Sequence, residues 1–119
     1  MSSATPSRGE IWTAHLGEPP VLHWVVVVSL NPRNHRAGVR SILIVPFSSK
    51  LYEGPTTMIL DPQETGLPNR SILRAHFIQP VTKSRLVERV PKELSGARMQ
   101  ELCFAIRRSF DPDALMSAL

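Results

Sequence analysis

The side chain best placed for acid–base chemistry is His23, which directly precedes Trp24 and a run of four valines, residues 25–28. β-Branched residues favour a covered strand, and side chains alternate along a strand, so His23 shares a face with Val25 and Val27. It therefore lies at the mouth of a strand, where an apolar interior meets loops. A histidine there can transfer a proton near neutral pH, or it can be a strand-end residue held by a structural hydrogen bond. The sequence leaves both interpretations open.

Other chemistries find no support in the spacing of the reactive residues. The histidines are His15, His23, His35 and His76. They are not four residues apart on a predicted helix, and HExxH, CxxC, GxGxxG, phosphate-loop and nucleophile-elbow motifs are absent. We therefore predict no metal and no cofactor. The single cysteine, Cys103, excludes an intramolecular disulfide, and its place on the apolar side of a predicted helix predicts a buried, unreactive thiol.

Positive charge gathers in and beside a turn-rich segment, residues 31–38. Arg33, Arg36 and Arg40 lie there with His35, in a chain whose formal net charge is +4. Such a cluster is either a solvated loop or a contact for a polyanion, because basic side chains release counterions when they bind a phosphate backbone. Arg8 also allows two interpretations, since it can order the entrance of the fold or reach a phosphate.

Five segments have the composition of strands, and one has the spacing of a helix. The strands are predicted over residues 9–16, 21–29, 39–48, 56–60 and 71–81, the last of them broken near Ala75. Pro46 predicts a bend or an edge position, because proline cannot donate to a ladder. The helix follows Ser95, a suitable N-cap, and stops at "DPD", residues 111–113. Its apolar stripe consists of Met99, Leu102, Cys103, Ile106 and Phe110. The pattern predicts a mainly β fold with α, a small antiparallel barrel of five to seven strands with one C-terminal helix.

The length of 119 residues suits one domain with a core of its own. The polar start predicts a disordered N-terminal tail over residues 1–7, and residues 8–119 form a single predicted domain. The N-terminus lacks the apolar core of a signal peptide, and no apolar run reaches the roughly 18 residues that span a bilayer. We therefore expect a cytoplasmic protein with no membrane partner.

The order of several short motifs along the chain carries more information than any one of them alone. "RGEIW" at residues 8–12 precedes the valine strand that ends in Ser29, and Asn31 follows. "SILIVPFSS", "TGLPNRSILRAHFIQPVTKSRL" and the terminal amphipathic helix come next. This order resembles the MazF/PemK/Kid family of toxins from type II toxin–antitoxin systems, over about residues 8–110. The resemblance implies an SH3-like barrel of the CcdB/PemK type and a homodimer. It also implies sequence-specific, metal-independent cleavage of single-stranded RNA, and an acidic antitoxin that lies across the active face.

The resemblance also implies a site, at which this chain departs from the family pattern. The Arg-Pro pair before the family's valine strand contains its most important catalytic residue, and here that pair is replaced by His23-Trp24. Glu18 falls where the family has a loop glutamate, and Ser48 aligns with its strand-end hydroxyl, usually threonine. The implied catalytic residues are thus His23, Ser48 and Glu18. The implied RNA-binding residues are Arg8, Arg33, Arg36, Arg40 and His76.

Plainer interpretations stand beside these roles. Ser48 and Ser49 can be strand-end hydroxyls bonded to the backbone. Glu18 can be an exposed loop charge, and His76 can be half-buried packing. Trp24 can pack in the core or a dimer interface, or it can stack on a base of single-stranded RNA.

The first functional hypothesis is an endoribonuclease toxin with an altered catalytic centre. One rival is a catalytically dead member kept as a binding protein. Another is a toxin that binds a protein target such as DNA gyrase, as the related CcdB proteins do. The basic loop and "RGEIW" favour the first hypothesis, whereas the missing arginine favours the rivals. Arginine is a permanent cation with forked donors, and histidine instead exchanges a proton near neutral pH.

Overall fold

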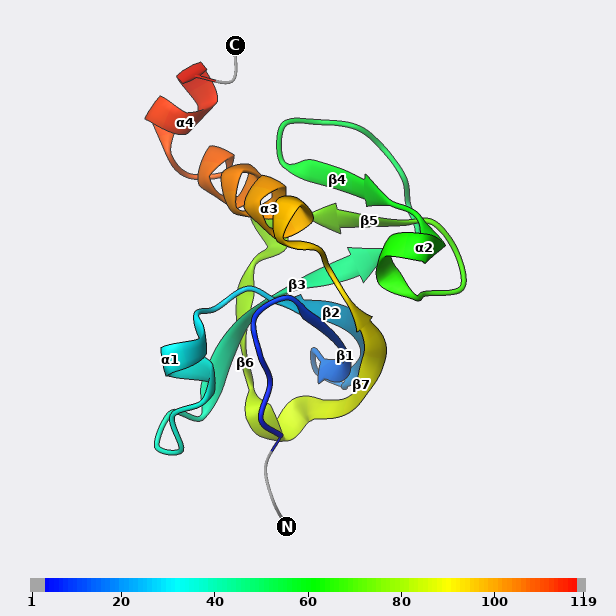
Figure 1. Ribbon diagram of the computed structural model, residues 1–119, viewed down its shortest axis with the longest axis vertical. Helices are drawn as coiled ribbons and strands as arrows, with labels where there is room; N and C mark the ends of the chain where they lie inside the picture. Colours follow the sequence, from blue (N-terminus) through cyan, green and yellow to red (C-terminus); the bar gives the residue numbers. More distant parts are fainter. Residues whose placement is uncertain (1–3, 118–119) are drawn as a thin grey trace.

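An antiparallel sheet dominates the computed structural model, which describes residues 4–117 (Figure 1). Its strands are β1 (Glu10–Leu16), β2 (Val21–Val27), β3 (Ser41–Ser48), β4 (Thr57–Leu60), β5 (Ser71–Arg74), β6 (Gln79–Thr82) and β7 (Leu86–Glu93). They pair in the order β4-β5-β3-β2-β1-β7, and β6 also pairs with β3. Within the described residues β4 and β7 end this order without pairing with each other. The predicted antiparallel fold of five to seven strands is therefore confirmed, but its description as a barrel is loose because the sheet stays open.

The valine run is buried on both faces of the sheet. Val26 and Val28 belong to the larger apolar cluster, which also contains residues of the C-terminal helix, such as Leu102. Val25 and Val27 belong to a second cluster on the other face. This division follows from the alternation of side chains along a strand. It explains why consecutive β-branched residues are tolerated here, since neither face of β2 is open to water at this point.

The partner of β3 changes at Pro46. On one side, β3 pairs with β2 through Val25 opposite Pro46. On the other side, Ser41–Ile44 pairs with β6, whereas Phe47 and Ser48 pair with β5. Pro46 thus lies between two partners in the interior of the sheet, not on an edge strand. Its missing N–H falls where the second ladder is interrupted in any case.

The predicted break near Ala75 is confirmed. A 3₁₀ turn, η1 (Ala75–Phe77), separates β5 from β6, so that the segment 71–82 supplies two strands to the same side of β3. The turn leaves Phe77 and His76 exposed, while Ala75 is buried.

Several elements were not predicted from the sequence. These are β7, the 3₁₀ turn η2 (Lys83–Arg85), and the short helices α1 (Asn31–Asn34), α2 (Pro62–Thr65) and α4 (Pro112–Ser117). β7 is an edge strand that pairs with β1 and carries mostly exposed, charged side chains and a proline. Charges and proline protect an edge strand from further pairing. The same residues remove the alternation by which a strand is recognised.

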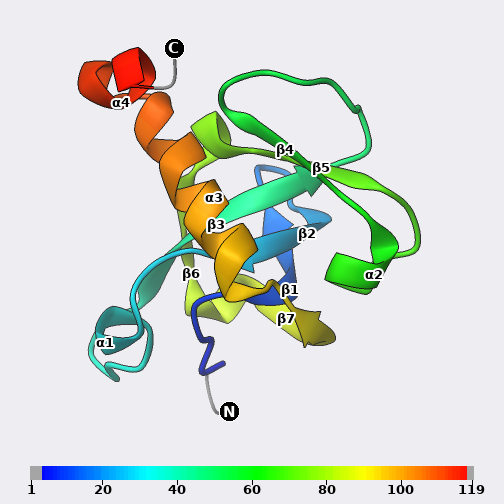
Figure 2. The same cartoon turned by 45° about the horizontal axis from the view of Figure 1, so that its top comes forward.

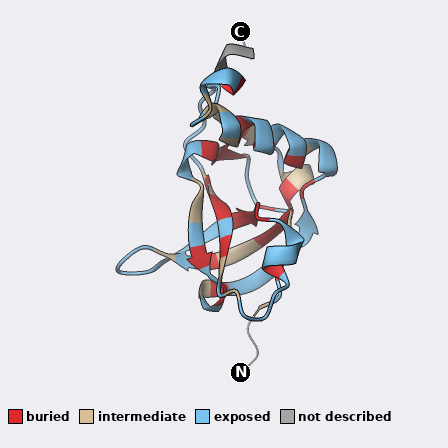
Figure 3. Cartoon of the chain, turned by 90° about the vertical axis from the view of Figure 1, so that its left-hand side faces the viewer, coloured by how far each residue is buried: buried red, intermediate tan, exposed pale blue. Residues whose placement is uncertain are grey.

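The predicted C-terminal helix is α3 (Gly96–Arg108), and it lies across the sheet (Figure 2). The Ser95 hydroxyl caps it by accepting a hydrogen bond from the backbone N–H of Arg98 at 3.2 Å. Of the residues of α3, Met99, Leu102 and Ala105 are buried. The rest of its surface is mostly exposed, as the burial colouring shows (Figure 3).

Two residues of the predicted apolar stripe are exposed. Cys103 is exposed, so its assignment as core filler is wrong. Phe110 lies two residues beyond the end of α3 and is 71% exposed. Because the sheet covers only one narrow side of α3, residues at the margin of the stripe stay in contact with solvent.

The predicted tail, residues 1–7, lies partly outside the described residues. Of its described part, Pro6 is buried, and the backbone N–H of Ser7 donates to Glu10 Oε1 at 2.8 Å. The same carboxylate oxygen accepts from Trp12 Nε1 at 3.1 Å, and Arg89 of β7 pairs with its other oxygen at 3.1 Å. Glu10 of "RGEIW" therefore ties the start of the chain to both β1 and β7.

An ion pair between Glu64 and Arg98 joins α2 to α3. The Arg98 guanidinium donates to Glu64 Oε1 at 2.6 Å and to Oε2 at 3.2 Å. This contact, with help from the backbone N–H of Asp61, holds the pKa of the Glu64 carboxyl below its usual range. A lowered carboxyl pKa stabilises the folded state above the ordinary value of 4.5, and the stabilisation is lost as the pH falls through the lower, folded value.

A double-mutant cycle with Glu64→Gln and Arg98→Ala is expected to give a coupling of roughly 0.5–1 kcal/mol near pH 7 in urea unfolding. The coupling should shrink toward zero well below pH 4.5, because Glu64 is then protonated. The pair Asp61–Arg70, whose side chains are 57% and 59% exposed, is the control and should show little coupling at either pH. Equal Glu64–Arg98 coupling at both pH values would contradict this account.

Candidate active site

A surface cavity of about 500 Å³ brings His23 and Ser48 together. It lies where the start of β2 meets the end of β3 and the junction of β5 and β6. Its lining consists of Leu16, Gly17, His23, Pro46, Phe47, Ser48, Ser49, Arg74, Phe77 and Gln79. We call it the His23 cavity. Its size is in the range of cavities that hold small molecules or parts of larger ligands.

The register of β2 and β3 explains why His23 and Ser48 meet. Val25 lies opposite Pro46, so the same antiparallel register continued by two residues places His23 opposite Ser48. Opposite residues in an antiparallel pair point to the same face of the sheet. The buried valines end at Val25, and His23 therefore occupies the first solvent-accessible position on that face.

The contacts of His23 and Ser48 leave both side chains able to bind a ligand, although Ser48 also makes the backbone bond of its plainer interpretation. In the described part of the chain the exposed His23 ring makes no hydrogen bond, so the contact required by its plainer interpretation is not found. Ser48 Oγ accepts from the backbone N–H of Lys50 at 3.3 Å. The Ser48 hydroxyl proton is left to donate to a ligand, as is the hydroxyl of the exposed Ser49.

Arg74 joins this pair from β5, and its role was not predicted from the sequence. Phe47 lies opposite Leu73, so Arg74 is placed beside Pro46, on the same face as Ser48. Its guanidinium carbon lies 4.3 Å from the centroid of the Phe77 ring. Its Nε is buried without a hydrogen-bond partner.

The contacts of Arg74 leave it available to an anion. Among the described residues no carboxylate pairs with its guanidinium, which rests on an aromatic ring instead. Arginine keeps its charge at all relevant pH values and offers forked donors that match two phosphate oxygens. A buried donor without a partner is costly, so it indicates a group that a ligand can satisfy. The sequence signal for Arg74 was an arginine at the end of the buried segment "SILR". His23 is comparable, because it stands at the margin of the valine run.

The set of groups in the His23 cavity suits reactions of phosphate esters. His23 can exchange a proton, Arg74 can bind anionic oxygens, and Ser48 can donate a neutral hydrogen bond. The cation is thus supplied from β5, whereas the family resemblance implied an arginine in the place of His23.

Glu18 lies outside the His23 cavity. It is exposed in the turn of the β1–β2 hairpin and lines a neighbouring cavity with His15, Thr82 and Arg85. The structure therefore does not bring the three implied catalytic residues into one cavity, although the two cavities are adjacent.

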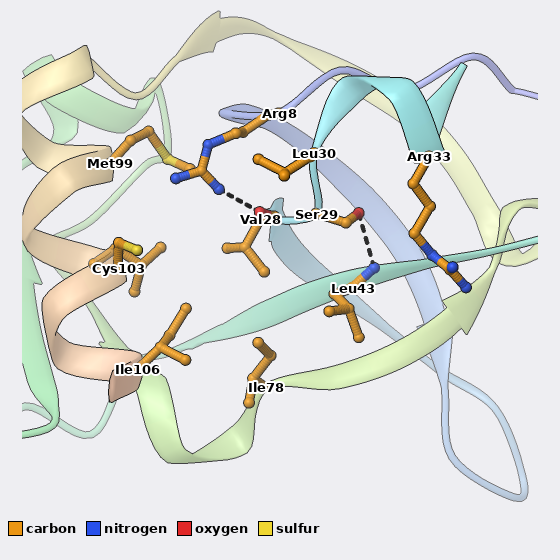
Figure 4. A pocket seen from close by; sticks show the side chains of 11 residues that line it. Arg8, Val28, Ser29, Leu30, Arg33, Leu43, Ile78, Met99, Cys103 and Ile106 are labelled. Atoms are coloured by element: carbon orange, nitrogen blue, oxygen red, sulfur yellow. Dashed lines mark hydrogen bonds between the residues drawn. The ribbon is translucent and has the colours of Figure 1, made fainter. Parts of the chain in front are cut away.

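Two of the implied RNA-binding residues, Arg8 and Arg33, line a third cavity of about 440 Å³, between α3 and the sheet (Figure 4). Arg8 donates to the backbone oxygen of Val28, and Arg33 Nη2 donates to Ser41 Oγ at 3.1 Å. The remaining lining is almost entirely apolar and includes Cys103. The Arg8 guanidinium is thus held against the backbone at the end of the valine run.

The remaining candidates lie elsewhere. Arg36 and Arg40 are exposed in the segment between α1 and β3 and do not line the His23 cavity. His76 is exposed, not half-buried, and its Nδ1 lies 2.8 Å from Thr56 Oγ1. Trp24 is 40% exposed and lines a separate hollow with Leu67, so it is not a core residue.

The described residues, 4–117, contain neither a metal-binding group of side chains nor a helix that could cross a membrane. No three side chains of His, Cys, Asp or Glu gather there in a group that can hold a metal ion. In the same residues, no helix has the length and apolar character needed to cross a membrane.

The comparisons with known proteins agree with one another. The chain is 29% identical over 112 residues to the "Probable endoribonuclease MazF5" of Mycobacterium tuberculosis, which covers 92% of this chain and 96% of that protein. Among solved structures, it resembles an endoribonuclease in complex with its cognate antitoxin from a mycobacterial species. That match has a TM-score of 0.75 at 21% identity, over 90% of this chain and 96% of the other.

A second structure, the Mycobacterium tuberculosis toxin MazF-mt6, matches with a TM-score of 0.74 at 19% identity, over 86% of this chain and 96% of that one. At these identities the structural matches establish the fold. The family model for PemK-like, MazF-like toxins of type II toxin–antitoxin systems matches residues 7–110. Since that match spans nearly the whole chain, the chain belongs to the PemK-like, MazF-like toxin family.

Proposed function

We propose that this toxin is a metal-independent endoribonuclease that cleaves single-stranded RNA in the His23 cavity. The observation that carries the proposal is the joint placement of His23, Ser48 and the unpaired Arg74 on one face of the sheet. The relative described as a probable endoribonuclease supports the same reaction class. Residues 8–119 act in this proposal as one toxin domain that works in the cytoplasm, where messenger RNA is found.

The proposed reaction uses the RNA's own 2′-hydroxyl as the nucleophile. Its oxygen forms a bond to the adjacent phosphorus, the bond from phosphorus to the 5′-oxygen breaks, and the products are a 2′,3′-cyclic phosphate and a 5′-hydroxyl. The 2′-oxygen loses one proton and the 5′-oxygen gains one, so the reaction needs no further reactant. His23 is the group that can carry this proton. Arg74 and Ser48 stabilise the charge that builds on the non-bridging oxygens.

The proposal is tested with end-labelled single-stranded RNA and purified protein in EDTA. We expect cleavage, with 2′,3′-cyclic phosphate ends on the 5′ fragments. The matched control is DNA of the same sequence, which lacks the 2′-hydroxyl and should stay intact. Absence of cleavage over a pool of all short RNA sequences, or cleavage that needs an added divalent metal, would overturn it.

We also propose a homodimer and a cognate acidic antitoxin as partners. Phe104 on α3, Phe110 just beyond its end and Leu30, which lines the cavity beside α3, are exposed apolar side chains suited to contact with a second copy. An acidic segment can mimic RNA by placing carboxylates on the cations that otherwise bind phosphates. Sedimentation at micromolar concentration that gives the mass of one chain would exclude the dimer. A neighbouring acidic protein that neither binds the toxin nor restores growth would exclude that protein as antitoxin.

A further inference from the structure

A second cavity adjoins the His23 cavity on the side of the β1–β2 hairpin. It measures about 370 Å³ and is lined by His15, Leu16, Gly17, Glu18, Gln79, Pro80, Val81, Thr82 and Arg85. We call it the hairpin cavity. It shares Leu16, Gly17 and Gln79 with the His23 cavity, so a chain that enters one can continue into the other. A single-stranded RNA cleaved beside His23 thus has a neighbouring nucleotide within reach of the hairpin cavity.

The hairpin cavity contains polar groups that no other residue engages. In the described part of the chain, the exposed Glu18 carboxylate makes neither a hydrogen bond nor an ion pair. Gln79 Nε2 donates to the backbone oxygen of Phe77 at 3.1 Å, which leaves its side-chain oxygen as a further acceptor. The cavity therefore offers a charged acceptor on one wall, next to the entrance from the His23 cavity.

Arg85 fixes the position of Glu18 and also contributes donors. Its Nη1 donates to the backbone oxygens of His15, near the end of β1, and of Gly17, the first residue of the turn, at 3.1 and 3.3 Å. Gly17 has a φ of +81°, a left-handed conformation that glycine adopts without strain, and Glu18 follows it directly. The Nη2 and Nε donors of Arg85 have no partner among the described residues. The positive charge of the Arg85 guanidinium also offsets the repulsion between the Glu18 carboxylate and a phosphate backbone.

We infer that the hairpin cavity binds a guanine base next to the cleaved bond and that Glu18 is its specificity-determining residue. This inference rests on the proposed endoribonuclease function. A carboxylate can accept two parallel hydrogen bonds from guanine N1–H and N2–H₂, and arginine donors suit guanine O6 and N7. Uracil offers one N–H between two carbonyl oxygens, both of which a carboxylate repels. Adenine and cytosine each offer an amino group without an adjacent ring N–H.

The inference separates Glu18 from the catalytic groups. A carboxylate that takes part in the chemistry affects every substrate, whereas one that binds a base affects only RNA with that base at the matching position. Single-stranded RNA is commonly recognised through hydrogen bonds to the Watson–Crick edges of unstacked bases, as this arrangement requires.

The cleavage experiment compares the wild-type protein with Glu18→Gln on an RNA pool randomised around the cut site. The variant keeps the shape of the side chain and removes its charge. We expect guanine to be preferred over uracil at one position next to the cut by about ten- to a hundred-fold, and this preference to fall to within a few-fold in the variant. The rate on RNA with uracil there should stay the same or rise, because the amide no longer repels the carbonyl oxygens of uracil. Glu53→Gln, the same charge change in an exposed loop, is the matched control.

A binding experiment gives a readout that does not depend on cleavage. Guanosine and uridine 5′-monophosphates are titrated separately into the protein while backbone amide NMR shifts are followed. We expect guanosine monophosphate to shift the amides of Gly17, Glu18 and Thr82 in the wild type, with much weaker effects from uridine monophosphate and in Glu18→Gln.

The outcomes distinguish this inference from the proposed function. Equal shifts from both nucleotides, or an unchanged response in Glu18→Gln, would overturn the guanine site. A uniform loss of cleavage for all sequences in Glu18→Gln would also overturn it, because Glu18 would then act in the chemistry. If no RNA is cut but guanosine monophosphate binds in a Glu18-dependent manner, the proposed function fails and the guanine site stands.

Discussion

Alanine in place of His23 is expected to lower the rate of RNA cleavage by about two to four orders of magnitude, the usual contribution of a general acid or base. The stability should change little, because the ring is exposed and makes no hydrogen bond among the described residues. Cleavage is measured per folded molecule, and the melting temperature is measured on the same samples. A lower melting temperature with unchanged cleavage would mean that His23 is structural.

Chemical rescue and one substitution sharpen the role of His23. Added imidazole should restore part of the activity of His23→Ala, because it supplies the missing proton-transfer group in a cavity that is open to solvent. His23→Arg places a cation where the family resemblance implies one, but it cannot exchange a proton at neutral pH. If only His23→Arg cleaves RNA and the native protein does not, the native protein is a catalytically dead member of the family and the proposed function is wrong.

Arg74→Ala is the second substitution with a large expected effect, a loss of about two to three orders of magnitude in kcat/KM. The reason is that this guanidinium is the permanent cation in the His23 cavity and has no competing carboxylate among the described residues. Arg74→Lys should recover only part of the loss, since an ammonium cannot bind two phosphate oxygens with a planar fork. Added guanidinium should rescue Arg74→Ala, and imidazole should not.

Arg70→Ala is the matched control for Arg74, because it removes an arginine from the loop just before the same strand. Arg70 pairs with Asp61 on the surface and does not line the His23 cavity. Its loss should leave cleavage within a few-fold of the wild type. Similar losses for both variants would show that the total charge matters and that Arg74 has no special position.

The elements that could be predicted from the sequence are those whose signal is local. The valine run of β2, the apolar run of β3 and the 3.6-residue spacing of α3 each indicate their structure without help from distant residues. β7 could not be found in this way. It is stabilised by pairing with β1, and Thr13 and Glu88, which exchange hydrogen bonds across that pair, are 75 residues apart in sequence.

The residues of the candidate site show the same difference between local signals and tertiary placement. His23 was recognised because it stands just before the valine run of the strongest strand, and a family resemblance then indicated Ser48. Arg74 was missed because its place beside them depends on how β5 pairs with β3, which residue types alone do not determine. Glu18 was assigned to the catalytic groups by alignment, but the short hairpin turns it toward the neighbouring cavity. Which side chains line the same cavity depends on the tertiary fold, so the sequence alone predicts it only weakly.

The hydrogen bonds between Arg85 and the hairpin also affect the order in which contacts form while the chain is synthesised. The carbonyl of His15 receives its partner only when a residue 70 positions later has been made. Contacts between such distant residues form late, because the intervening chain must first close a long loop. A nascent chain that ends before η2 can pair β1 with β2, yet it leaves the turn between them unanchored. During synthesis, His23, Ser48 and Arg74 of the His23 cavity are therefore all made before Arg85, the residue that holds the turn beside them.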